Sequence, residues 1–335
     1  MFNRCIYLVY LVGLLTAFAI RCSDSEHDGT PVDADSGLAP DADSDGDSAP
    51  DTDDPQVPEL TPIASEVALQ LGSYVRRLKV RAADHDPYPV AWAFVNVSCE
   101  ERALALEWAI ATADPSLDGD PQTMDEAELT RERIQEVADN PSFDVASINI
   151  TGPMVAEQYF IQPDGTEVGE MPFTLFWTYH HGAALNVDGT IKVLDLSQGD
   201  EPIDIDTWYS ALVEPDVECF PMGNKEWQDV WIYWNSVLNG FELPPEPNRL
   251  CGYTITPMFK MRWDLPIQFD QLGWTPSTME VQTLAFMTTL SDGRYGYDLE
   301  IPISDVPFFT SRYVGKPFLE VCVWEPTYIF CSKSN

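Results

Sequence analysis

The spacing of apolar residues predicts helices in four places along the chain. The first covers residues 99–113, where Ala103, Leu106 and Ile110 recur at helical spacing and two glutamates suit the first turn. The others are predicted over residues 124–138, 205–212 and 225–238. All four lie within the part of the chain that we expect to be a mixed α/β region.

Between these helices the apolar pattern changes to the alternation and β-branched runs that are typical of strands. The predicted strands cover residues 144–150, 155–161, 172–179, 183–186 and 191–196. Asp164-Gly165 and Asp188-Gly189 predict tight hairpin turns. The fold class expected from this succession is α+β, with much of the sheet antiparallel.

From residue 246 onward the pattern is β-rich, with strands predicted over residues 279–290, 297–303 and 318–324. This part could be a small β-sandwich or an extra layer of the main sheet. We therefore expect a mixed α/β domain over residues 59–245 and a β-rich C-terminal domain over residues 246–335.

The first residues predict export from the cytoplasm. Arg4 precedes an apolar run over residues 5–20, which is short for a membrane span but suits a signal peptide. Two processing routes fit residues 1–22. Ala17-Phe18-Ala19 matches the small-x-small pattern of ordinary signal cleavage, whereas Cys22 at the end of the run resembles the lipid-anchor cysteine of a bacterial lipoprotein. The mature protein is expected to be secreted or held at the cell surface of a bacterium.

An acidic linker follows over residues 23–58. No Lys or Arg occurs between Arg21 and Arg76, and Asp, Ser, Pro and Gly dominate the segment. Such a self-repelling run is expected to be disordered, and it would serve as a spacer behind a lipid anchor. The formal net charge of the whole chain is −37. That charge argues against nucleic acid as a partner, because phosphates would be repelled.

The seven cysteines divide into three groups. Cys5 and Cys22 belong to the signal region, and Cys99 is the one cysteine between them and the last four, which are Cys219, Cys251, Cys322 and Cys331. In an oxidising compartment the last four are expected to form two disulfides, with three pairings open. Cys99 is then left with a thiol.

Nucleophilic catalysis by that thiol would need a base and a group that orients the base. Of the four histidines, His27 lies in the acidic linker and His85 in a segment rich in Asp and Pro. His180 and His181 lie on a predicted strand, where consecutive side chains face opposite ways, so at most one of them can serve Cys99.

Asp195 is the expected orienting group. It interrupts an apolar strand, where a carboxylate is costly without a partner, and this strand follows the one that carries His180. Cys99 is expected at a helix N-terminus, which favours a thiolate and offers backbone N–H groups to an oxyanion. The Cys and His spacings fit no zinc pattern.

At these positions the sequence resembles the bacterial protein-glutaminases, which deamidate glutamine side chains of proteins. Residues 99–103 read Cys-Glu-Glu-Arg-Ala and match the family pattern Cys-x-x-Arg-Ala; residues 177–180 read Trp-Thr-Tyr-His and match Trp-x-Tyr-His. Residues 193–197 match a strand that ends in Asp, with Ser two positions on. Further comparable positions are Pro202, Thr207, Trp208 and Cys219.

The resemblance implies a transglutaminase-like or papain-like cysteine hydrolase core, in which a helix bearing Cys packs on an antiparallel sheet bearing His and Asp. It implies a catalytic triad of Cys99, His180 and Asp195, protein or peptide substrates with glutamine, and no metal or organic cofactor. The same triad would serve a transglutaminase or a thiol peptidase. Each residue also has an ordinary structural explanation, so a non-catalytic surface-binding lipoprotein remains a further alternative.

Overall fold

The computed structural model describes residues 57–80, 88–90, 92–93, 99–114, 128–129, 141–162, 164–239, 241–258, 309–317, 322–325 and 328–331. All of them belong to one compact unit. The predicted signal peptide, nearly all of the acidic linker and the strands predicted over residues 279–290 and 297–303 lie outside the described residues.

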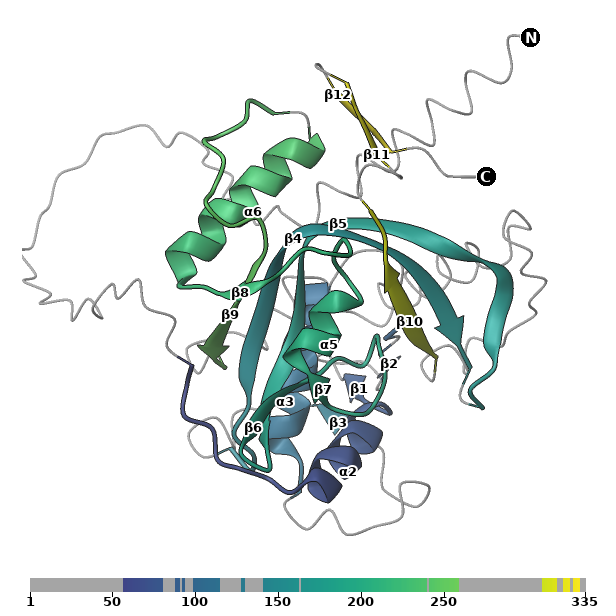
Figure 1. Ribbon diagram of the computed structural model, residues 1–335. Helices are drawn as coiled ribbons and strands as arrows, with labels where there is room; N and C mark the ends of the chain where they lie inside the picture. The colour runs from purple at the N-terminus through teal and green to yellow at the C-terminus, as the bar shows by residue number, and fades with distance from the viewer. Residues whose placement is uncertain are drawn as a thin grey trace, which may run out of the picture. The chain divides into compact units, whose positions relative to one another are not determined.

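The centre of the fold is a curled, mostly antiparallel sheet built on two long strands, β4 (Ala146–Ile161) and β5 (Glu167–Val187). Figure 1 shows both strands bending over the helices below them. Each replaces two shorter strands expected from the sequence. The register of β4 against β5 shifts between Thr151 and Met154 and again between Gln158 and Phe160. Such irregularities bend a strand without ending it, so a break in the alternation need not be a break in the strand.

Further strands, some of them from distant parts of the sequence, complete this sheet. β6 (Thr190–Leu194) and β7 (Ile203–Asp204) extend it beyond β5. β9 (Gly252–Pro257) and β10 (Thr310–Gly315) pair with β4, and β8 (Phe220–Pro221) pairs with β9. Both β9 and β10 come from the part expected to form a separate C-terminal domain. The boundary expected at residue 245 therefore does not divide this sheet.

Three short strands form a second sheet: β1 (Lys79–Val80), β2 (Tyr88–Pro89) and β3 (Glu128–Leu129). β3 pairs in parallel with β1. The helix predicted over residues 124–138 is therefore wrong at residues 128–129, where pairing with a distant strand outweighs the local polar helical pattern. The rest of that segment lies outside the described residues.

Four described helices flank the main sheet: α2 (Ser65–Val75), α3 (Cys99–Thr112), α5 (Ile205–Ser210) and α6 (Asn224–Asn239). Helices α3, α5 and α6 confirm three of the four predicted helices, while α2 was not predicted. None of the helices in the described part is long and apolar enough to cross a membrane.

The main hydrophobic core lies between α2, α3 and the sheet. Leu106 and Ile110 of α3 pack in one buried cluster with Leu185 of β5 and Leu194 of β6. Within this core the Glu107 carboxylate of α3 accepts a 2.7 Å hydrogen bond from the Ser147 hydroxyl of β4. Burial of both groups makes this contact costly to break, so it fixes α3 against the sheet.

The hairpin between β5 and β6 turns where the sequence predicts it. Asp188 and Gly189 both have positive φ angles, 51° and 87°. A two-residue turn of this kind suits the twist of antiparallel strands, and Gly adopts it without steric cost. The short turn sets the register that places Leu194, the last residue of β6, opposite Ala183 of β5.

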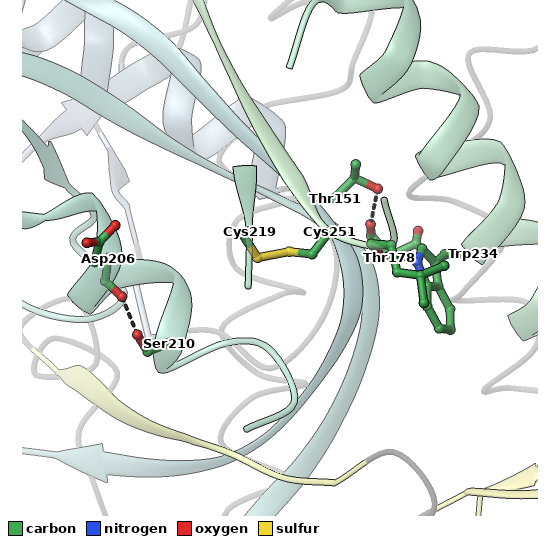
Figure 2. Close-up of a disulfide and its surroundings, with 8 residues drawn as sticks. Thr151, Thr178, Asp206, Ser210, Cys219, Trp234 and Cys251 are labelled. Atoms are coloured by element: carbon green, nitrogen blue, oxygen red, sulfur yellow. Dashed lines mark hydrogen bonds between the residues drawn. A yellow bond between two sulfur atoms is a disulfide. The ribbon is translucent and has the colours of Figure 1, made fainter. Parts of the chain in front are cut away.

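A disulfide between Cys219 and Cys251 joins the segment before β8 to the start of β9 (Figure 2). It packs against β4 at Gly152, where a Cβ atom would lie only 2.9 Å from the Cys251 sulfur. The glycine is needed for this close approach. The disulfide ties the chain after α5 to the main sheet.

The last two cysteines are predicted to form a second disulfide. In the hairpin of β11 (Cys322–Glu325) and β12 (Tyr328–Cys331), Cys322 lies directly opposite Cys331. Directly opposed residues of antiparallel strands have Cα atoms about 4.5–5.5 Å apart, within the range that a disulfide spans. Peptide mapping without reduction should yield a Cys322–Cys331 peptide beside the Cys219–Cys251 peptide. Recovery of alkylated Cys322 from unreduced protein would contradict this.

Candidate active site

His180 of β5 and Asp195, the residue that follows β6, lie side by side in the curled sheet. The distance from His180 Nε2 to Asp195 Oδ2 is 2.8 Å. Both residues are buried, with exposed fractions of 6 % and 7 %. Water therefore competes little for this contact, and a charge-assisted hydrogen bond there is strong.

Asp195 accepts several further hydrogen bonds. Its Oδ1 accepts from the backbone N–H and the hydroxyl of Ser197, at 3.0 and 2.6 Å. Its Oδ2 accepts from the indole N–H of Trp208 on α5 at 2.9 Å and from the Gln198 amide at 3.4 Å. These donors hold the carboxylate in one orientation.

The same contacts decide the charge of Asp195. Burial alone would raise the pKa of this carboxyl, but the charge of His180 and the hydrogen bonds from His180, Ser197 and Trp208 outweigh it and lower the pKa. Asp195 is therefore ionised at neutral pH.

The imidazole of His180 lies beside two aromatic rings, and one of its two nitrogens makes no hydrogen bond with the described residues. The Trp177 and Trp208 ring centroids lie 6.3 and 5.9 Å from that of His180. Nδ1 is buried and has no hydrogen-bond partner among the described residues. A buried polar atom in that condition is uncommon and calls for an explanation.

His181 has different surroundings. Its ring meets the Tyr179 ring edge-on, with centroids 5.1 Å apart. Burial and the charge of His180 lower the pKa of His181 to about 3, so His181 is neutral near pH 7. Of the two neighbouring histidines, His180 is thus the one bound to a carboxylate.

Cys99 is the first residue of α3, with a partly exposed, reduced side chain. Because His180 Nδ1 has no hydrogen-bond partner in the described part of the chain, the Cys99 thiol does not hydrogen-bond to it in this structure. The helix that Cys99 begins packs against β5, the strand that carries His180. Burial and the charge of Asp195 raise the pKa of Tyr313 on β10, and the charge of Arg102, one helical turn after Cys99, acts in the opposite direction.

The structure therefore brings two of the three predicted residues, His180 and Asp195, into direct contact and places the third, Cys99, at the start of a helix that packs against the strand carrying His180. Their catalytic role stays a prediction. Ser197 and Trp208 were visible in the sequence only as motif positions. No motif or spacing in the sequence predicts that Tyr313 lies near Asp195, because the two residues belong to segments far apart in the chain.

His27 and His85 lie outside the described residues. Within the described ranges, no group of three or more His, Cys, Asp and Glu side chains is arranged to hold a metal ion. The chemistry available at the His180–Asp195 pair is that of an imidazole and a carboxylate.

Replacing Trp208 by phenylalanine should destabilise the protein markedly, because the buried Asp195 carboxylate would lose its indole donor. The expected loss is about 2–3 kcal/mol in the free energy of unfolding, measured by denaturant titration. Trp234→Phe is the matched control, since the Trp234 indole donates to the neutral Leu250 carbonyl at 2.7 Å in an exposed setting. Its expected cost is about 1 kcal/mol or less. Equal losses in the two variants would contradict the importance of the contact with Asp195.

Comparison of the chain with protein-family models, with curated proteins and with solved structures found no match.

Proposed function

We propose that this protein is an exported cysteine amidohydrolase that converts protein-bound glutamine to glutamate and ammonia. The observation that carries the proposal is the buried His180–Asp195 pair. One ring nitrogen is bound to an ionised carboxylate and the other has no hydrogen-bond partner among the described residues. The choice of glutamine rests on the resemblance of residues 99–103, 177–180 and 193–197 to the protein-glutaminases.

The contact with Asp195 determines which nitrogen of His180 can act as a base. A carboxylate accepts hydrogen bonds only, so the neutral imidazole carries its proton on Nε2. Nδ1 then holds a lone pair. That nitrogen can take the Cys99 proton once the two side chains meet, and catalytic hydrogen bonds of this kind often tighten only when substrate is bound.

The proposed reaction has two halves. The Cys99 thiol gives its proton to His180 Nδ1, and the thiolate sulfur attacks the carboxamide carbon of a glutamine side chain. The backbone N–H of Cys99 helps to hold the oxyanion. The C–N bond breaks as His180 returns the proton to departing ammonia, which leaves a thioester. Water, deprotonated by His180, attacks the thioester; glutamate leaves and the thiol is restored.

The arrangement of elements supports a transglutaminase-like core as part of this proposal. Cys99 begins a helix that packs on an antiparallel sheet, and His180 and Asp195 belong to consecutive segments of that sheet. The order of helix-borne Cys, strand-borne His and strand-end Asp is the one that thiol enzymes of this kind use.

Export is supported by the Cys219–Cys251 disulfide, because structural disulfides persist in oxidising compartments. Together with the apolar run over residues 5–20, it favours a protein that acts outside the cytoplasm, on protein or peptide substrates met there. Anchoring through Cys22 is one of the two processing routes.

The test is a product assay with a blocked glutaminyl peptide, with and without a primary amine. We expect ammonia and glutamyl peptide in equal amounts, and no change when the amine is added. Prior treatment with iodoacetamide should stop the reaction, and reduced glutathione added to the reagent beforehand should protect it.

Each other result would identify a different function. Incorporation of the amine would make the protein a transglutaminase. Cleavage of the peptide backbone in a protein substrate would make it a thiol peptidase. If neither ammonia, nor amide exchange, nor cleavage is seen with a set of glutamine-rich proteins, the proposal of an amidohydrolase is wrong and a binding protein is favoured.

A further inference from the structure

We infer that Trp208 of α5 is a positioning residue for His180. Its indole N–H donates to the carboxylate oxygen that also binds His180, and its ring lies beside the imidazole. The inference rests on the proposed function for its effect on the reaction rate. Its structural part concerns three buried side chains alone, those of Trp208, His180 and Asp195.

The first contribution of Trp208 is to fix the Asp195 carboxylate. A carboxylate offers about four lone-pair positions. Oδ1 accepts from the N–H and the hydroxyl of Ser197, and Oδ2 accepts from His180 Nε2 at 2.8 Å and from Trp208 Nε1 at 2.9 Å. The Gln198 amide makes a longer contact with Oδ2, at 3.4 Å. Rotation of the carboxylate would break these hydrogen bonds, so His180 has one place to bind on Oδ2.

The second contribution comes from the indole ring. Its centroid lies 5.9 Å from that of the His180 imidazole, and the two ring planes differ by 32°. Trp208 is fully buried and His180 nearly so. In a closely packed interior, a large ring in this position limits how far the imidazole can tilt about its hydrogen bond to Asp195. The N–H and the ring of one side chain therefore restrict both the position and the tilt of the imidazole, and with them the direction of Nδ1.

The space for the indole depends on Gly182 of β5. Gly182 lies two residues after His180, so a side chain there would project from the same face of the strand. A Cβ atom at this position would lie only 2.8 Å from Val193 Cγ1 and 3.5 Å from Trp208 Cζ2. The glycine therefore allows Val193 and Trp208 to pack closely beside His180.

Contacts with two strands of the main sheet hold α5 in place. Tyr209 follows Trp208 in the helix, and its ring stacks on that of Tyr253 in β9, with centroids 6.5 Å apart and planes 24° apart. Just after the helix, Val213 forms an isolated bridge with Met154 of β4. The position of Trp208 is therefore set by the packing of α5 on the sheet, which a short helix could not supply alone.

The placement of His180 matters in both halves of the proposed reaction. Its Nδ1 must take the proton of the Cys99 thiol in the first half and a proton of water in the second. A misplacement of about 1 Å can lower a rate about a hundredfold. Because Trp208 is one of several restraints on His180, we expect a smaller effect, about tenfold in kcat, when its N–H is removed.

The experiment removes only the indole N–H. Trp208 is replaced by 3-benzothienylalanine, in which a sulfur atom takes the place of the N–H group and the shape of the ring is kept. The matched control is the same replacement at Trp234, whose indole donates to the Leu250 carbonyl at 2.7 Å in an exposed setting. The first readout is the downfield proton NMR resonance of His180 Nε2–H, identified by its loss in Asp195→Asn. We expect this resonance to shift in the Trp208 variant and to stay in place in the Trp234 variant.

The second readout is the rate of ammonia release. The Trp208 variant should lower kcat about tenfold with little change in KM, because the restraint acts on the base and not on the binding of substrate. The Trp234 variant should leave both constants unchanged. In a protein that also carries His180→Gln, the replacement of Trp208 should lower kcat no further, because the side chain through which Trp208 acts is gone.

The outcomes separate this inference from the proposed function. The positioning role would be overturned by an unchanged His180 resonance in the folded Trp208 variant, by an equal shift in the Trp234 variant, or by the lack of any Asp195-dependent resonance in the unsubstituted protein. An unchanged kcat in the Trp208 variant of a protein that releases ammonia would overturn it too. A further loss of about tenfold in the presence of His180→Gln would show that Trp208 does not act through His180. A shifted resonance in a protein that releases no ammonia would uphold the positioning role and refute only the amidohydrolase.

Discussion

Replacement of Cys99 by alanine is expected to abolish ammonia release from a glutaminyl peptide. No other group in the proposed mechanism can form the thioester, so kcat/KM should fall by about 10⁴-fold or more. The fold should be retained, because Cys99 is partly exposed at the first position of α3 and alanine is a good helix former. Kinetics at saturating and low substrate, together with the midpoint of thermal unfolding, would measure both effects.

The matched variant is Cys99→Ser, which keeps an oxygen nucleophile of similar size. A hydroxyl is far less acidic than a thiol, so serine should recover little of the lost rate. Retention of more than about a hundredth of the activity in Cys99→Ala would show that the thiol is not the nucleophile. His180 and Asp195 would then need another role.

The local pattern was enough to predict α3, α5 and α6. In α3 the residues Ala103, Leu106 and Ile110 recur at helical spacing, and in α6 Trp227, Trp231 and Trp234 do so. It was also enough for the Asp188-Gly189 turn, where residue type alone favours positive φ. The pattern of apolar residues did not predict the correct element where pairing between distant segments decides the structure. Glu128 and Leu129 form a strand because they meet Lys79 and Val80, and β10 joins β4 across a long interval of sequence.

The candidate site likewise has one part that the local sequence predicts and another part that depends on contacts between distant segments. The proximity of His180 and Asp195 follows from a hairpin, and a hairpin is a local structure whose register the turn fixes. The contact of β10 with the turn after β6, in which the Ser311 N–H donates to the Ser197 carbonyl at 2.7 Å, joins segments far apart in the sequence, and no periodicity predicts it. The sequence identified Trp208 only as a position comparable with the protein-glutaminase pattern. Its role is visible only once α5 lies against the His180 ring.

Replacement of His180 by glutamine is expected to lower kcat about a thousandfold, because general acid–base catalysis by a placed side chain contributes roughly 10²–10⁴. Glutamine can still donate an amide hydrogen bond to Asp195, so the buried carboxylate keeps a partner and the fold should survive. What it lacks is the second nitrogen with a lone pair. The loss should therefore appear in both halves of the reaction, as slower release of ammonia and slower hydrolysis of the thioester.

His181→Gln is the control that the chain itself offers. His181 lies one position along the same strand and is equally aromatic, but its ring packs edge-on against Tyr179 and is neutral near pH 7. Its replacement should cost about 0.5–1.5 kcal/mol of stability through the lost ring contact and leave kcat within a few-fold of the unsubstituted protein. If His181→Gln lost the activity and His180→Gln kept it, His181 and not His180 would be the catalytic base. Asp195 would then be a structural partner of His180 alone.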